Sequence, residues 1–219
     1  MNNKDTKLLL KGCGLIVTFI IWTYLIQMVD VKAIGLNGTN IGFATLNTNF
    51  HKLIGVHMNL YIITDWMGLV PLLICVIFGM MGLKQLITRK SIFKVDYDII
   101  LLGIYYLVVV FVYLIFEEYP INYRPIPIDG FMEASYPSST TLLVLSVMPT
   151  LNFQSKRRIS NIKIAKIICI CSNIFSLFMV IGRMISGVHW FTDIIGSLLF
   201  SIGLFYIYKS CVILMQRIN

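Results

Sequence analysis

The segment from Gly182 to Asp193 carries the residue types that chemistry on an anion requires. It reads GRMISGVHWFTD, so an arginine, a histidine and an aspartate follow one another closely. His189 and Asp193 are four residues apart, and on a helix they would share one face, where the carboxylate can reach a ring nitrogen. Such a partner fixes the tautomer and leaves the other nitrogen free as a nucleophile or base. Arg183 could bind the anion that His189 attacks, although a polar cluster that seals a helix end would use the same residues.

Two further segments carry groups that bind phosphate. Residues 136–140 read YPSST and place a proline and hydroxyl groups at a predicted helix start. Free N–H groups and the positive end of the helix dipole attract phosphate there, so Ser138 and Ser139 are candidate phosphate-binding residues, and ordinary N-capping is compatible with this interpretation. The segment 117–127 adds Arg124. The predicted topology, described below, places two arginines, one histidine and one carboxylate at the same depth relative to the membrane. Such a group favours an anion site over isolated structural arginines.

These segments lie between apolar runs that are long enough to cross a bilayer. The chain has 219 residues, of which 58% are hydrophobic and 13% charged, and its mean hydropathy of +0.83 excludes a disordered chain and argues against a soluble enzyme. We predict an all-α polytopic membrane protein, with 1–219 as a single membrane domain and six transmembrane helices. The predicted helices cover about 8–29, 64–87, 97–116, 138–153, 164–182 and 192–213.

Residues 30–63 separate the first two runs and are too broken by Gly and Asn to cross the membrane. We expect them to form an interfacial or re-entrant cap over the outer ends of the helices. The cap contains His51 and His57.

The basic residues predict the orientation. On one side of the predicted membrane lie 14 of the 18 Lys and Arg residues, and the side with few of them carries all three candidate segments. By the positive-inside rule both termini are cytoplasmic and the site faces the extracytoplasmic side of the cell membrane. The short basic loops account for the net charge of +8, so no nucleic-acid partner is expected. All five cysteines lie in apolar runs, which argues against disulfides and a zinc site.

The three segments together resemble the motifs of the type 2 phosphatidic acid phosphatases, membrane relatives of the vanadium haloperoxidases. The third motif, Ser-Arg-x5-His-x3-Asp, matches here with Gly182 in place of the serine. The first, Lys-x6-Arg-Pro, keeps Arg124 and the following proline but has Glu117 in place of the lysine. The second, Pro-Ser-Gly-His, reads Pro-Ser-Ser-Thr, which puts Thr140 at the histidine position. The resemblance covers about residues 64–213.

The resemblance implies a role for each matching residue. His189 would attack phosphorus to give a phosphohistidine, with Asp193 as its orienting partner. Arg124 and Arg183 would clamp the phosphate, and Ser138 with the amides near Ser139 would cradle it.

Two roles of the family have no occupant in this sequence, the phosphate-binding lysine and the general-acid histidine. Losing a general acid typically costs ~10²–10⁴ in rate. A surrogate acid could be Glu133, His51 or His57, and Thr140 itself could donate only a hydrogen bond. Alternatively the leaving group needs no proton, which favours a diphosphate such as a polyprenyl diphosphate, because a phosphate monoester departs as a stable anion.

We therefore predict an integral membrane lipid phosphatase acting on a lipid-linked phosphate or diphosphate at the outer leaflet. Its partners are the bilayer and that lipid. No metal or other cofactor is implied, because too few carboxylates converge with the arginines to hold Mg²⁺. The alternatives are a catalytically inactive protein that binds phospholipid head groups, and a lipid phosphotransferase. A transporter is less favoured, because no pair of broken helices indicates a path.

Overall fold

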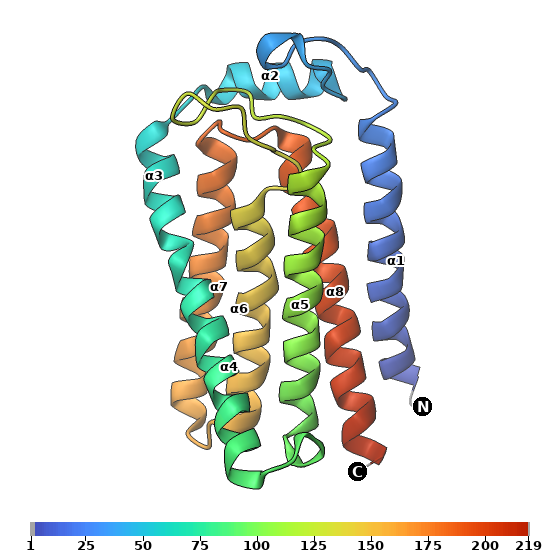
Figure 1. The fold of residues 1–219 in the computed structure, drawn as a ribbon, viewed down its shortest axis with the longest axis vertical. Coiled ribbons are helices and arrows are strands. Elements are labelled where there is room, and N and C mark those ends of the chain that lie inside the picture. The colour runs from blue at the N-terminus through green and yellow to red at the C-terminus, as the bar shows by residue number, and fades with distance from the viewer. Residues whose placement is uncertain (1–2, 219) are drawn as a thin grey trace.

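The computed structural model describes residues 3–218, which form a bundle of helices standing side by side (Figure 1). The main helices are α1 (Asn3–Ile26), α3 (Met58–Met67), α4 (Leu69–Arg89), α5 (Tyr97–Glu118), α6 (Ser139–Arg158), α7 (Ile162–Ile185) and α8 (Phe191–Ile218). A shorter helix α2 (Ala44–Ile54) and two 3-10 turns, η1 (Leu36–Gly38) and η2 (Ile92–Lys94), lie between them. Within residues 3–218 the β-bridges are isolated pairs outside any strand, so the predicted all-α class is confirmed.

The bundle has six columns, because α3 and α4 continue one another through Gly68, whose backbone keeps helical angles. Within the described residues, five stretches are long and apolar enough to cross a membrane: Asp5–Ile26, Met58–Arg89, Tyr97–Glu118, Ile162–Ile185 and Phe191–Arg217. The sixth column, α6, packs against α4, α5, α7 and α8. This central position explains its polar composition, because its buried Thr150 and Gln154 hydrogen-bond to tyrosines of α5 and α8 rather than facing lipid. The predicted membrane bundle of six helices agrees with this architecture.

Several predicted helix ends were wrong. The first helix ends at Ile26 and not near 29, and the fourth runs on to Arg158 and not to about 153. It continues because Arg157 and Arg158 pair with carboxylates of neighbouring segments instead of ending the helix in solvent. The second column begins at Met58 and not at 64, because the chain turns at Gly55, whose φ of 73° ends α2. The cap in the structure is therefore shorter than the predicted 30–63 by the same residues.

The predicted cap is present, and it contains a helix, α2, that lies across one end of the bundle (Figure 1). Its buried Asn47 side chain is bonded to the start of α8: the amide nitrogen donates to the Thr192 hydroxyl over 3.0 Å, and the amide oxygen accepts from the Thr192 N–H. Leu46 and Leu53 on the same helix are exposed. An anchored inner face and an apolar outer face are typical of a helix at a membrane interface.

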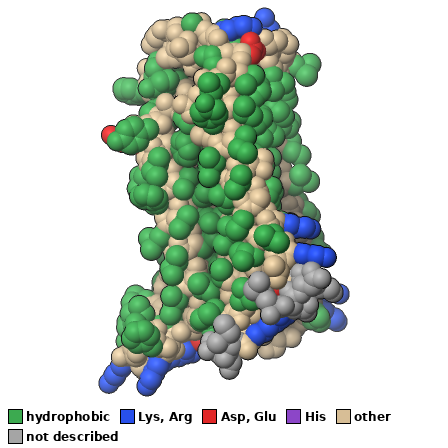
Figure 2. Space-filling model, turned by 90° about the vertical axis from the view of Figure 1, so that its right-hand side faces the viewer, with side chains coloured by type: hydrophobic (Ala, Val, Ile, Leu, Met, Phe, Trp, Pro, Cys, Tyr) green, Lys and Arg blue, Asp and Glu red, His purple; other side chains and the backbone are tan. Residues whose placement is uncertain are grey.

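Both termini lie at the opposite end of the bundle (the terminal end), and the cap marks the site end (Figure 1). Figure 2 shows hydrophobic side chains along the sides of the bundle, with most of the visible Lys and Arg side chains gathered toward the terminal end. The molecule thus presents lipid-compatible sides between two polar ends.

The long loop at the site end, residues 119–138, is held by Tyr136. Its ring packs between Phe19 and Phe116, and its hydroxyl lies 2.6 Å from the hydroxyl of Thr23. The ring also fills the space beside Gly196, where a Cβ would lie 2.5 Å from a ring carbon. This packing fixes the chain immediately before α6.

Candidate active site

The predicted site residues come together at the site end of the bundle. Arg183 lies in the last turn of α7, His189 in the turn that follows, and Asp193 in the first turn of α8. Arg124 comes from the 119–138 loop, and Ser138 directly precedes α6. All five side chains are buried.

The turn that carries His189 is held in place by the residues that directly follow α2. Gly187 has a φ of 70°, and a Cβ on it would lie 2.0 Å from the carbonyl oxygen of Gly55. Only glycine fits this close approach, which is strengthened by the hydrogen bond from the His57 N–H to the Ser186 carbonyl, 2.9 Å. The cap therefore sets the position of the turn between α7 and α8.

One ring nitrogen of His189 is engaged and the other is open. Nδ1 lies 3.1 Å from the backbone carbonyl oxygen of Ser135 and 3.2 Å from the Ser135 hydroxyl. A carbonyl oxygen can only accept, so Nδ1 carries the proton. Nε2 is buried and has no hydrogen-bond partner among the described residues. Its lone pair is available for attack on an electrophile.

The contact between His189 and Asp193 was predicted, but its geometry differs from a shared helical face. His189 precedes α8, and its Nδ1 lies 3.8 Å from Oδ2 of Asp193. Ser135 bridges the two residues, because its hydroxyl donates to the same carboxylate oxygen. Asp193 also accepts from the Trp190 N–H over 2.9 Å and from the Asn122 amide over 3.3 Å. The carboxylate is thus fully buried and held in place beside the ring.

Burial lowers the pKa of His189 to about 4. Asp193 opposes this shift, and the positive charges of Arg124 and Arg183 add to it. The imidazole is therefore neutral at physiological pH, as a nucleophile must be.

The two arginines each use one nitrogen and leave two open. Nη2 of Arg124 lies 3.0 Å from Glu133. Nη2 of Arg183 lies 2.6 Å from Asp65 and also donates to Thr140. On both side chains Nε and Nη1 are buried without a partner among the described residues. The ring of Tyr61 lies against both guanidinium groups, 4.8 Å from Arg183 and 5.7 Å from Arg124.

At the start of α6, where the sequence predicts a phosphate cradle, Ser138 and Ser139 differ in their surroundings. The Ser138 hydroxyl donates to Thr141 and its N–H to the Asp193 carbonyl, so both groups are engaged within the protein. Ser138 makes no side-chain cap, which the sequence had left as an alternative. Ser139 is half-buried and lines two pockets beside the arginines.

The suggested surrogate acids are distributed unevenly. Glu133 pairs with Arg124, as described, and Thr140 is held by Arg183. Nε2 of His51 lies 3.0 Å from the Gly187 carbonyl oxygen. His57 is exposed, and its Nε2 lies 3.0 Å from the Ile54 carbonyl oxygen at the end of α2. Two of the four therefore contact the arginines directly, whereas the two histidines bond to backbone in and beside the cap.

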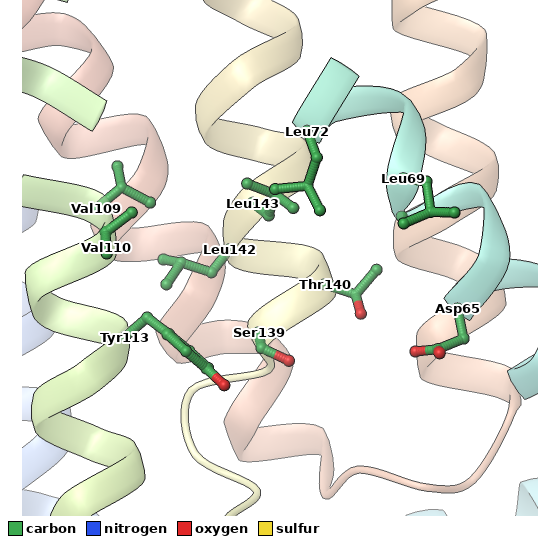
Figure 3. Close-up of a pocket in the computed structure, with 11 residues that line it drawn as sticks. Asp65, Leu69, Leu72, Val109, Val110, Tyr113, Ser139, Thr140, Leu142 and Leu143 are labelled. Carbon is green, nitrogen blue, oxygen red and sulfur yellow. The ribbon is translucent and has the colours of Figure 1, made fainter. Parts of the chain in front are cut away.

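Two pockets border this site. A polar one of about 180 Å³ is lined by residues that include Glu117, Arg124, Glu133 and Ser139. An apolar one of about 380 Å³ lies between α4, α5 and α6. Figure 3 shows Ser139, Thr140 and Asp65 along one edge of the apolar pocket, with Tyr113 beside Ser139, and leucine and valine side chains along the rest. The arrangement suits a molecule with an anionic head and an apolar tail.

Sequence reasoning missed four residues of the site: Tyr61, Asp65, Asn122 and Ser135. Each reaches the site through a contact between distant parts of the chain, such as the 118 positions that separate Asp65 from Arg183. One signal was available, because Asp65 is a carboxylate within an apolar run.

Comparisons with known proteins identify the fold and the family. No curated protein matches the chain. Among solved structures, the chain is similar to the first transmembrane PAP2 type phosphatidylglycerolphosphate phosphatase from Bacillus subtilis, with a TM-score of 0.63 at 18% identity over 95% of this chain and 98% of that one. Such a similarity shows a shared fold. The family model of the PAP2 superfamily matches residues 104–214, about half of the chain, including all three motif segments. The chain belongs to the PAP2 superfamily.

Proposed function

We propose that the protein is an integral membrane phosphatase that hydrolyses a lipid-linked phosphate or diphosphate through a phosphohistidine. One observation carries the proposal: Nε2 of His189 and the Nε and Nη1 atoms of Arg124 and Arg183 are buried without partners among the described residues. A buried donor without a partner costs about 1–3 kcal/mol. A tetrahedral oxyanion bound to both guanidinium groups would satisfy these donors and present phosphorus to the imidazole.

The reaction uses the groups already described. The lone pair of His189 Nε2 attacks phosphorus, and the imidazole gains positive charge as the bond forms. Asp193, held beside the ring by Ser135, stabilises that charge and keeps the proton on Nδ1. Arg124 and Arg183 stabilise the charge on the phosphoryl oxygens. Water then hydrolyses the phosphohistidine.

The apolar pocket supports a lipid substrate. Its walls include Leu69, Leu72 and Val109, and its polar end is formed by Ser139, Thr140 and Asp65. We place the lipid tail in this pocket with the phosphate on the arginines. On the motif residues alone, Thr140 favours a diphosphate such as a polyprenyl diphosphate, because a hydroxyl cannot act as an acid near neutral pH.

We propose that the site end faces the extracytoplasmic side and that both termini are cytoplasmic. Basic residues at the terminal end support this orientation (Figure 2). Single cysteines replacing Asp129 at the site end and Lys94 at the terminal end should label from opposite sides of sealed vesicles. Labelling of both from one side would contradict the orientation.

The activity is tested by phosphate release. Purified protein should release phosphate from a short-chain phosphatidate or from a polyprenyl diphosphate, and His189→Ala should abolish the release while the arginines still bind orthovanadate. Orthovanadate binding without any release would favour the inactive head-group-binding protein. Transfer of phosphate to an added alcohol in preference to water would favour the phosphotransferase.

A further inference from the structure

The position of the family's general acid is occupied here by Thr140, whose hydroxyl is held by Nη2 of Arg183. The same nitrogen donates to Oδ1 of Asp65 over 2.6 Å. Asp65 and Thr140 therefore meet on one guanidinium nitrogen, and Figure 3 shows both side chains at the polar end of the apolar pocket. A carboxyl group lies beside the place where an acid is missing.

Asp65 differs from the other carboxylates of the site in its access to the substrate. Asp193 is fully buried and bonded to Ser135, Trp190 and Asn122. Glu133 lines the polar pocket, on the Arg124 side. Asp65 lines the apolar pocket, and its side chain is 55% exposed. With the lipid tail in this pocket, as proposed above, the oxygen that joins phosphorus to the tail lies at the polar end of the pocket, beside Asp65.

We propose that Asp65 is the catalytic residue that donates the proton to the leaving group, an inference that rests on the phosphatase activity proposed above. Asp65 lies outside residues 104–214, the part of the chain that the family model matches. The missing acid is thus replaced by a residue from a different helix, α3, at the mouth of the lipid pocket.

Substrate binding itself loads the proton. A phosphate bound to Nε and Nη1 of Arg183 would lie beside the Asp65 carboxylate, which is bound to Nη2 of the same guanidinium group. Two anions at such a short distance repel one another, and a proton shared between them relieves the repulsion. A phosphomonoester, whose second pKa is near 6, can bring that proton as the monoanion. In the proposed cycle this proton passes to Asp65, and the arginines then hold the phosphate dianion.

The steps balance. His189 Nε2 forms a bond to phosphorus, the bond from phosphorus to the lipid oxygen breaks, and that oxygen takes the electron pair and the Asp65 proton. The lipid alcohol leaves. Water then attacks phosphorus, the Asp65 carboxylate takes a proton from it, and the electron pair of the N–P bond returns to Nε2. With an acid in place, a phosphomonoester becomes a competent substrate beside a diphosphate.

The test compares two phosphomonoesters that differ in their need for an acid. Dioctanoyl phosphatidate must expel an alkoxide, whereas 4-nitrophenyl phosphate expels a stabilised phenolate. Asp65→Asn should lower hydrolysis of the first by ~10²–10⁴ and change the second little. Asp65→Glu, which displaces the carboxyl by one methylene, should also lower the ratio of alkyl to aryl hydrolysis. Asp129→Asn, at an exposed carboxylate of the 119–138 loop, is the matched control and should leave both rates unchanged.

Orthovanadate binding verifies that each variant retains the site. An unchanged alkyl-to-aryl ratio in both Asp65 variants would overturn the proposal. If both rates fall by the same factor, Asp65 only positions Arg183, and if neither rate falls, Asp65 has no role in the reaction. Wild-type protein that binds orthovanadate but hydrolyses neither ester, nor a polyprenyl diphosphate, would overturn the phosphatase activity itself and the role of Asp65 with it.

Discussion

Two pairs of arginines lie at opposite ends of the bundle and differ in how many of their nitrogens have partners. At the terminal end, every guanidinium nitrogen of Arg157 and Arg158 donates a hydrogen bond. The acceptors are Asp96, Asp98, Tyr97, Gln154 and Gln216. At the site end, Arg124 and Arg183 use Nη2 alone, and their Nε and Nη1 atoms are buried without partners among the described residues.

We interpret this difference as one between a structural role and a proposed binding role. Arg157 and Arg158 tie α6 to α5 and α8, and their hydrogen bonds are complete without a ligand. Arg124 and Arg183 are more deeply buried, yet each retains two donors that only an added acceptor can satisfy. We therefore propose that arginines with open donors bind a ligand in this fold and that arginines with filled donors clamp helices together.

The largest expected effect is on anion affinity at the site end. Arg183→Ala and Arg124→Ala should each weaken orthovanadate binding by ~3–5 kcal/mol, or more than about a hundredfold, because each removes a buried charged partner. Calorimetry in detergent measures the affinity. Arg158→Ala is the matched control from the terminal end, and a comparable loss of affinity in that variant would erase the distinction between the two pairs.

The next effect is on the protonation of His189. Its pKa of about 4 lies below the usual 6.5 because of burial, with a contribution from the open arginines. Activity should therefore persist through pH 6 and fall only as the pH drops toward 4, where the Nε2 lone pair is lost. Arg124→Ala should raise the midpoint, because a nearby positive charge is removed, and Arg158→Ala should leave it in place.

Nuclear magnetic resonance of labelled histidine measures this midpoint, with His189→Ala identifying the resonance. A resonance that disappears in His189→Ala and titrates near 6.5 in the unchanged protein would contradict a neutral, desolvated nucleophile.

The smallest effect concerns stability at the terminal end. Arg158→Ala removes hydrogen bonds to Asp96 and Asp98 and leaves the buried Asp98 carboxylate with a longer contact to Arg157, 3.5 Å. The free energy of unfolding should fall by about 1–3 kcal/mol. Thermal unfolding in detergent measures the change, with Lys94→Ala, an exposed residue of η2, as the control. A stability equal to that of the wild type would mean that this network is not a clamp.

Much of the fold and part of the site could be predicted from the sequence. Apolar runs separated by basic loops fixed the helices, since membrane spans need long uninterrupted apolar segments. His189, Asp193, Arg183 and Arg124 were found because they fall in short polar segments at one end of those runs. Their convergence agrees with the expected constellation, although Ser135 bridges His189 and Asp193 where a helical contact was expected.

The remaining site residues were missed because little in the local sequence marks them, and only Asp65, a carboxylate within an apolar run, carried a signal. Ser135 is one serine among several in the chain, and its role depends on the loop that Tyr136 anchors. Tyr61 fell within the predicted cap and Asp65 within the first turn of the predicted second helix, and neither position indicated a contact with the arginines. Which carboxylate meets which arginine depends on how α3 packs against α7, a contact between distant segments.

The central claim is that His189 becomes phosphorylated on Nε2, and trapping the intermediate tests it most directly. Protein mixed with a ³²P-labelled lipid phosphate and quenched in alkali should carry an acid-labile, base-stable label on the peptide that contains His189. His189→Ala should carry none. Release of phosphate by the wild-type protein without any such label, or with a label on another residue, would contradict the account.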